Sequence, residues 1–176
     1  ANAGPLMVYN LAHIALKEAR VQKEKFVIFN EHSTLKTKIR NNMIMVGKIK
    51  SAIQNDRIVP YFQGIADNKT QKIVKYEALI RLIDEEGEVL SPYRFLEHAK
   101  KAKLYDQLTR IMITKTFAVF ESLEEFEFSI NLTLQDIQCE ETRSFLYQTI
   151  AQSSATKRAV FEIVESEGIE NFEEVS

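Results

Sequence analysis

Strand-like and helix-like segments alternate along this chain from residue 56 to its C-terminus, and this alternation constrains the fold most. Two strand-like runs, 58–65 and 73–82, come first, and the polar connection between them is typical of a hairpin. Helical segments separate the later strand-like runs, 126–133 and 158–164. Such an order requires crossover connections, which wind a parallel sheet into either an open sheet or a barrel. The sequence therefore predicts an α/β fold.

Helix signals lie between these strands. Ser91 and Pro92 provide an N-cap and a first-turn proline. The spacing of apolar residues predicts helices over 92–103, 105–120 and 140–152, and the start of another over 169–175. Crossovers between parallel strands usually contain a helix, so the helix signals agree with the predicted parallel sheet.

The first 55 residues have a different pattern. Apolar residues recur at helical spacing over 5–21, and 26–29 is a short β-type run. Ser33 is a suitable N-cap for a second helix, which ends near residue 55 and has its apolar residues on one stripe. These residues are Leu35, Ile39, Met43, Val46, Ile49 and Ile53. We predict a rigid connecting helix between a truncated unit before it and a larger unit after it.

Composition and charge limit the class of partner. With 45% hydrophobic residues, 27% charged residues and one cysteine, the chain resembles ordinary soluble globular proteins. No apolar run approaches the roughly 20 residues that span a bilayer. We expect a cytoplasmic segment without membrane contact, and a membrane anchor elsewhere in a longer protein stays compatible with it. The basic N-terminal third lacks interleaved aromatic residues and a reading motif, so we expect no nucleic-acid polymer as partner.

Polar residues occupy alternate positions within the predicted strands. Because side chains alternate between the two faces of a strand, Lys75, Glu77 and Arg81 point away from the apolar face of their strand. The next two strands carry Asn131 and Glu162. A sheet with helices on one side and polar groups on the other matches a barrel interior with a site at its mouth.

These polar residues allow two interpretations. Carboxylates within strands are costly to desolvate unless they are paired or bound to a metal. Hard divalent cations prefer carboxylate and amide oxygens, and Glu77, Asn131 and Glu162 supply three such ligands from three strands. The alternative is an ion pair of Arg81 with Glu77 or with Glu162, without a metal. The strand pattern leaves both interpretations open.

Five segments resemble, in order, the motifs of a known family. They are YFQGI (61–65), YEALIRL (76–82), LSPYRFLEHAKKAKL (90–104), FSINLT (128–133) and FEIVESEGIENF (161–172). Together they resemble the EAL domain, the cyclic-di-GMP phosphodiesterase family, and Glu77-Ala78-Leu79 is its signature triplet. The resemblance covers about residues 56–176. It implies the first half, about four strands, of a (β/α)8 TIM-type barrel.

The resemblance also implies roles for single residues. They are Glu77, Asn131 and Glu162 as metal ligands, Glu77 and Glu165 as catalytic residues, and Gln63 and Arg81 as substrate-binding residues. In the family a pair of Mg²⁺ or Mn²⁺ ions activates water, which opens one phosphodiester of cyclic-di-GMP to give linear pGpG. The resemblance therefore implies a two-metal site and cyclic-di-GMP as the ligand.

The segment before the connecting helix resembles the C-terminal helix and strand of a GGDEF domain, over residues 11–29. We therefore divide the chain into a GGDEF-like remnant (1–30), a linker helix (31–55) and a truncated EAL domain (56–176). The family's later acidic motif, its catalytic lysine and its last-strand glutamate have no counterpart before Ser176. We expect a fragment whose two-metal site is incomplete and which is inactive by itself.

Three functions are compatible with this sequence. The first is a longer cyclic-di-GMP phosphodiesterase of which this chain is a fragment. The second is a catalytically silent receptor that binds cyclic-di-GMP and passes the signal through the connecting helix. The third is an oligomerisation or signalling module. Because half a barrel leaves strand edges open, we also expect a homodimer or a domain-swapped oligomer.

Overall fold

The structure is a computed structural model that describes residues 34–164 without interruption. Before them it describes Tyr9, 12–13, 15–17, 19–20 and 23–27. The chain divides into two compact units, Ala1–Gly47 and Lys48–Ser176. Helix α2 (Thr34–Gln54) crosses the boundary between them. The sheet that carries the polar residues of interest belongs entirely to the second unit.

The first unit agrees in part with the predicted elements. Its described residues between Tyr9 and Arg20 are helical, as the spacing of apolar residues predicts. The predicted β-type run is wrong for residues 26–27, which do not belong to a strand, and its remainder, 28–29, lies outside the described residues. The predicted N-cap Ser33 also lies outside them. Among the described residues, no helix is both long and apolar enough to cross a bilayer.

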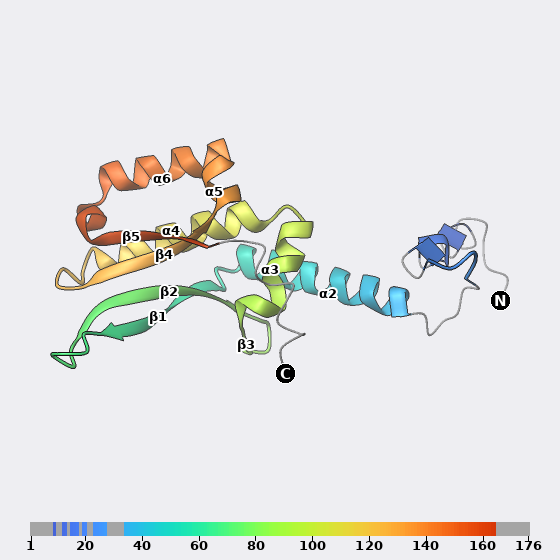
Figure 1. The fold of residues 1–176 in the computed structure, drawn as a ribbon, viewed down its shortest axis with the longest axis horizontal. Helices are drawn as coiled ribbons and strands as arrows, with labels where there is room; N and C mark the ends of the chain where they lie inside the picture. Colours follow the sequence, from blue (N-terminus) through green and yellow to red (C-terminus); the bar gives the residue numbers. More distant parts are fainter. Residues whose placement is uncertain are drawn as a thin grey trace. The chain divides into compact units, whose positions relative to one another are not determined.

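One mixed sheet forms the centre of the second unit (Figure 1). Its strands are β1 (Ile58–Ala66), β2 (Ile73–Ile83), β3 (Val89–Leu90), β4 (Glu127–Thr133) and β5 (Ala159–Val164). The order is β1-β2-β4-β5, and β3 pairs with β2. β1 and β2 are antiparallel, which confirms the predicted hairpin, whereas β4 is parallel to both β2 and β5. The predicted parallel sheet thus holds for three strands, and the hairpin makes the whole sheet mixed.

Helices fill the connections between the parallel strands. They are α3 (Pro92–Lys101), α4 (Tyr105–Phe120), α5 (Leu134–Gln138), α6 (Glu140–Gln152) and the 3₁₀ helix η1 (Ser154–Arg158). α4 and α6 have the predicted bounds, and α3 ends two residues early. Ser91 stands at the N-cap of α3, but its side chain makes no capping hydrogen bond. α5, η1 and β3 are too short to show a hydrophobic period, so the sequence pattern does not predict them. The predicted helix over 169–175 lies outside the described residues.

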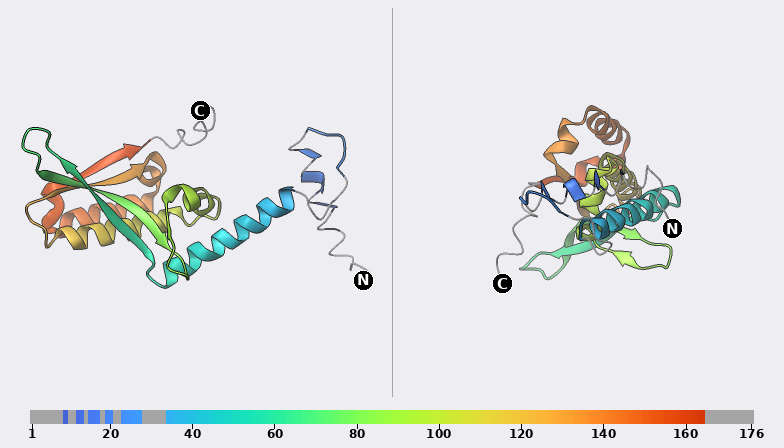
Figure 2. Two further views of the ribbon diagram at one scale, coloured as in Figure 1. Left: turned by 90° about the horizontal axis from the view of Figure 1, so that it is seen from below. Right: turned by 90° about the vertical axis from the view of Figure 1, so that its right-hand side faces the viewer.

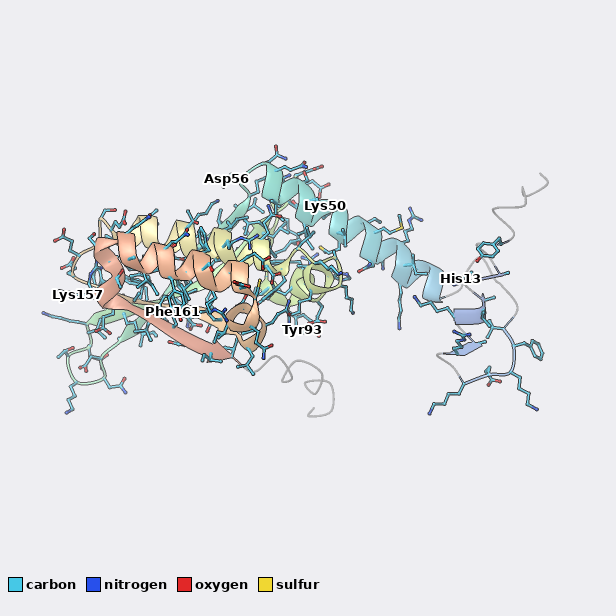
Figure 3. The ribbon with its side chains drawn as sticks, turned by 90° about the horizontal axis from the view of Figure 1, so that it is seen from above. His13, Lys50, Asp56, Tyr93, Lys157 and Phe161 are labelled. Atoms are coloured by element: carbon cyan, nitrogen blue, oxygen red, sulfur yellow. The ribbon has the colours of Figure 1, made fainter. Side chains whose placement is uncertain are left out.

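The core lies between the sheet and α4. It contains the buried residues Ala78, Met112, Ile113, Phe117, Phe120, Phe128, Ile130, Leu132 and Ala155. Phe128 is fully buried and stacks on Phe120, with 4.5 Å between the ring centroids. α6 lies beside α4, with Phe145 and Leu146 packed against the same cluster (Figure 2). Phe161 of β5, labelled in Figure 3, lies beneath α6 and lines a cavity of about 290 Å³ there. Helices therefore cover one face of the sheet.

The C-terminal end of β2 is fastened to the end of α2. Lys48 Nζ lies 2.8 Å from Oδ2 of Asp84, whose side chain is 1% exposed. Arg57 Nη1 donates to the carbonyl oxygen of Ile83 at 3.0 Å. The hydrogen bond from Lys48 lowers the pKa of Asp84, and the same bond raises the pKa of Lys48. These contacts fix the C-terminal end of β2, the strand that carries Glu77 and Arg81.

Candidate functional site

The face of the sheet opposite α4 carries the polar residues that the sequence places there. Ala78 of β2 and Ile130 of β4 belong to the core. Because side chains alternate along a strand, their sequence neighbours on β2 and β4 point to the other face of the sheet. The register pairs Gln63 of β1 with Glu77 of β2, and Asn131 of β4 with Glu162 of β5. The predicted metal ligands therefore lie on one face of three neighbouring strands.

Glu77 and Asn131 are in direct contact. Asn131 Nδ2 donates to Oε1 of Glu77 at 2.7 Å, which joins β2 to β4 across the polar face. The parallel register places Ser129 opposite Glu77, so the Asn131 side chain reaches back by two residues to make this bond. The hydrogen bond holds the Glu77 carboxylate toward β4. Two of the three predicted ligands are therefore brought together by the fold.

Glu162 is paired with a residue to which the sequence pattern assigned no function. Lys75 Nζ lies 2.7 Å from Oε1 of Glu162, and their side chains are 19% and 41% exposed. The hydrogen bond from Lys75, with a smaller contribution from Ser129, holds the pKa of Glu162 below its usual range. The position of Lys75, two residues before Glu77, puts it on the polar face. Its partner on β5 depends on strand order, which the sequence pattern does not give.

The two predicted substrate-binding residues differ in their positions. Gln63 is exposed and lies opposite Glu77 in the hairpin register, so it borders the site. Arg81 lies four residues further along β2, where its guanidinium carbon is 5.7 Å from the ring centroid of Tyr61. Arg81 Nη1 also donates to the Ile80 carbonyl oxygen at 2.8 Å. The sequence pattern allows an ion pair of Arg81 with Glu162 as an alternative to a metal. In the structure Glu162 pairs with Lys75 instead.

The chemistry of the donor set fits a hard divalent cation. Glu77 and Glu162 offer carboxylate oxygens and Asn131 offers an amide oxygen, which are the ligands that Mg²⁺ and Mn²⁺ prefer. Within residues 34–164 and the shorter described ranges before them, no group of three His, Cys, Asp or Glu residues could hold a metal ion. The predicted set has two carboxylates, and its third member is the amide of Asn131. Glu165, the other predicted catalytic residue, lies outside the described residues.

A buried hydrogen-bond network supports the end of β4, next to Asn131. Asp136 is 1% exposed and accepts hydrogen bonds from Thr109 Oγ1 at 2.7 Å and from the backbone N–H of Thr133 at 2.8 Å. Thr133 also donates its hydroxyl to Asp136 at 2.7 Å. Burial, and then the charge of Asp136, raises the pKa of Tyr105 to about 12. The network joins β4, α5 and α4. The sequence pattern does not predict it, because it depends on contacts between distant segments.

A small cavity adjoins the site on its apolar side. Its volume is about 220 Å³, and its lining includes Asn131, Leu79, Tyr105 and Val164. The lining is otherwise mainly apolar and comes from α3, α4 and the strands of the sheet. Asn131 therefore belongs both to the polar face and to the lining of this cavity, which also includes the core residues Ala78 and Met112.

Comparisons with known proteins agree with the sequence motifs. The family model described as "EAL domain" matches residues 46–176. The signaling protein YkoW of Bacillus subtilis is 30% identical over 95 residues, which are 54% of this chain and 11% of that protein. The chain therefore spans about a tenth of the length of this curated relative.

Solved structures share the fold. The FimX EAL domain of Pseudomonas aeruginosa bound to c-di-GMP matches with a TM-score of 0.56 and 20% identity, over 68% of this chain and 49% of that chain. The S helix-GGDEF-EAL structure of Vibrio cholerae LapD, also bound to c-di-GMP, matches with a TM-score of 0.60 and 15% identity, over 93% of this chain and 40% of that chain. The α/β fold with its mixed sheet thus matches EAL domain structures, and the chain spans less than half of each of these two.

Proposed function

Because this chain belongs to the EAL domain family, we propose that it is part of a cyclic-di-GMP phosphodiesterase whose site lies on the polar face of β2, β4 and β5. One observation carries the proposal. Glu77, Asn131 and Glu162, from three neighbouring strands, lie on the same face, and Asn131 donates to Glu77 at 2.7 Å. Two carboxylates and an amide on one face of neighbouring strands have the chemistry of a divalent cation site.

In this proposal Glu77, Asn131 and Glu162 hold Mg²⁺ or Mn²⁺. The cation supplies a water nucleophile at neutral pH and neutralises charge on the phosphoryl oxygens. Asn131 orients the Glu77 carboxylate through its Nδ2 hydrogen bond. Glu165 is proposed as a supporting acid from its place in the FEIVE segment.

Arg81 and Gln63 are proposed to hold the dinucleotide. A guanidinium binds a phosphate through two parallel N–H donors, and Arg81 is already placed at the end of β2 by its contact with Tyr61. Gln63 is exposed beside Glu77, where its amide reaches a phosphate or a base edge. FimX and LapD, whose structures are c-di-GMP complexes, support this choice of ligand.

The same proposal covers the organisation of the chain. Residues 56–176 form the first half of an α/β barrel, 31–55 connect it to what precedes, and 1–30 are the end of a GGDEF domain. The match over 93% of this chain to a structure described as S helix-GGDEF-EAL supports this order. A barrel half holds only part of a two-metal site, so the 176-residue chain is proposed to be inactive by itself and to associate through its open strand edges.

A binding experiment tests this function. Cyclic-di-GMP binding to the chain is measured by equilibrium dialysis in the presence of Mn²⁺, and pGpG is followed by chromatography in the same samples. We expect binding that is lost in Glu77→Gln and weakened in Arg81→Met. Arg94→Met is the matched control, because Arg94 is an exposed arginine of α3, outside the site. Binding that is equal in all four chains contradicts the proposed site.

A catalytically silent receptor is the second candidate, and the Lys75–Glu162 ion pair favours it. An internal ammonium already neutralises one of the proposed ligands, at 2.7 Å. A receptor binds cyclic-di-GMP with an affinity that is independent of divalent cation and forms no pGpG. A phosphodiesterase, when its barrel is complete, forms pGpG and needs the cation. The two candidates therefore separate when the longer protein is assayed with and without Mn²⁺.

A further inference from the structure

Lys75 lies on the polar face, and the proposed function leaves its charge unexplained. It lies on β2, two residues before Glu77, and therefore on the same face of the strand. Its register partner on β4 is Glu127, yet its ammonium extends past β4 to β5, where it meets Glu162 at 2.7 Å. The side chain thus crosses the face on which the proposed ligands lie.

The position of the ammonium resembles that of a bound cation. Glu77 is held by the neutral amide of Asn131, so this contact brings no positive charge to the face. Within the described residues, Lys75 is the basic side chain that forms a salt bridge with a proposed ligand. It supplies one positive charge next to Glu162. A divalent cation that uses Glu162 needs the same carboxylate.

We propose that Lys75 competes with the divalent cation for Glu162 and so sets the cation concentration at which the site fills. The inference rests on the proposed metal site and adds to it a residue that sets its cation affinity. In this proposal the ammonium and the cation use the same oxygen, Oε1 of Glu162, so Lys75 leaves when the cation binds. The pair is partly exposed, with Glu162 at 41%, so breaking it costs little, and the flexible four-carbon stem of lysine allows the ammonium to move into solvent.

The competing explanation is a purely structural ion pair. Such a pair joins β2 to β5 over β4 and is kept whether or not a cation binds. Removing it would then lower the stability of the sheet and leave the cation affinity unchanged or weaker. When Lys75 loses its charge, competition therefore predicts tighter cation binding, and a purely structural pair predicts equal or weaker binding.

The test measures Mn²⁺ binding to the full chain from the loss of the free-ion signal in electron paramagnetic resonance. Lys75→Met and Lys75→Gln remove the charge, and Lys75→Arg keeps it. We expect the two neutral variants to bind Mn²⁺ about fivefold more tightly, the factor expected from removing one partly exposed ion pair. Lys75→Arg is expected to bind like the unchanged chain. Lys72→Met is the matched control, since it removes a nearby exposed lysine and is expected to change the affinity by less than about twofold.

The outcomes separate this inference from the function on which it rests. Tighter binding in both neutral variants, abolished by adding Glu162→Gln, supports competition at Glu162. Equal or weaker binding in the neutral variants overturns the role of Lys75 and leaves the metal site standing. If neither the unchanged chain nor any variant binds Mn²⁺, the proposed metal site is wrong for this chain, and the competition is wrong with it. Thermal unfolding of each variant without Mn²⁺ shows that the compared chains are folded.

Discussion

The two faces of the sheet are made from the same strands, yet their contacts differ in kind. On the face toward α4, Phe128 is completely buried and stacks on Phe120 at 4.5 Å between ring centroids. On the opposite face, Glu77, Asn131 and Glu162 make polar contacts and keep part of their surface exposed. One strand thus carries buried core residues and partly exposed polar residues at alternate positions. We therefore expect substitutions on the first face to change stability, and under the proposed function we expect substitutions on the second to change ligand binding.

The largest effect is expected on the helix-covered face. Phe128→Ala removes a buried ring that also packs edge to face with Phe117 at 5.2 Å. The variant is expected to lose about 4 kcal/mol of unfolding free energy, because a cavity replaces the ring. Urea unfolding followed by circular dichroism measures the loss. A loss below about 1 kcal/mol would show that this face is not the core.

The next effect is expected at the buried network after β4. Asp136→Asn keeps the shape of the side chain but replaces the carboxylate, whose two oxygens accept hydrogen bonds from Thr109 and Thr133, by a neutral amide. We expect a loss of about 2 kcal/mol in unfolding free energy, since hydrogen bonds to a buried charged group are strong. Asp106→Asn, in the first turn of α4, is the control and is expected to be close to neutral. Equal losses in the two variants would show that the network does not support β4.

A pH dependence follows from the Lys48–Asp84 pair at the end of β2. The hydrogen bond from Lys48 lowers the pKa of Asp84 below its usual value of 3.8. A carboxyl whose folded pKa is lowered stabilises the fold above 3.8, and this stability is lost as the pH falls through the lowered pKa. The unfolding temperature of the chain is therefore expected to fall below about pH 4, and Asp84→Asn should flatten this decline. An unchanged acid limb in Asp84→Asn would assign the pH dependence to other carboxylates.

The smallest effect on stability is expected on the polar face. Glu77→Gln keeps an oxygen that accepts from Asn131 Nδ2 and removes a partly exposed charge. The unfolding free energy is expected to change by less than about 0.5 kcal/mol. Urea unfolding under the conditions used for Phe128→Ala gives the direct comparison. A loss as large as that of Phe128→Ala would remove the distinction between the two faces.

The sequence predicts those parts of the fold that follow from local periodicity. The 16-residue helix α4 has the predicted bounds, because its apolar residues repeat at helical spacing through its whole length. The alternation of β2 and β4 correctly places Glu77 and Asn131 on the face opposite Ala78 and Ile130. Positions within one element are thus predictable from the residues of that element.

The rest depends on which strands are neighbours and in which register. The alternative ion pair of Arg81 with Glu162 is wrong, because Glu162 pairs with Lys75, which lies 87 positions earlier in the sequence. The metal-ligand role of Glu162 stays a prediction. Arg81 instead contacts Tyr61 of β1. The Asp136 network likewise depends on a contact between two helices, the hydrogen bond from Thr109 of α4 to Asp136 of α5. These contacts join distant segments, and no local period predicts such contacts.

The most direct test of the polar face is to locate Mn²⁺ by the broadening of backbone amide signals in nuclear magnetic resonance spectra of the ¹⁵N-labelled chain. We expect broadening to centre on the amides of Glu77, Asn131 and Glu162, from β2, β4 and β5, and to disappear in Glu77→Gln. Broadening centred on the acidic turn at Glu85, Glu86 and Glu88 would contradict this account, because that turn is separate from the proposed ligands.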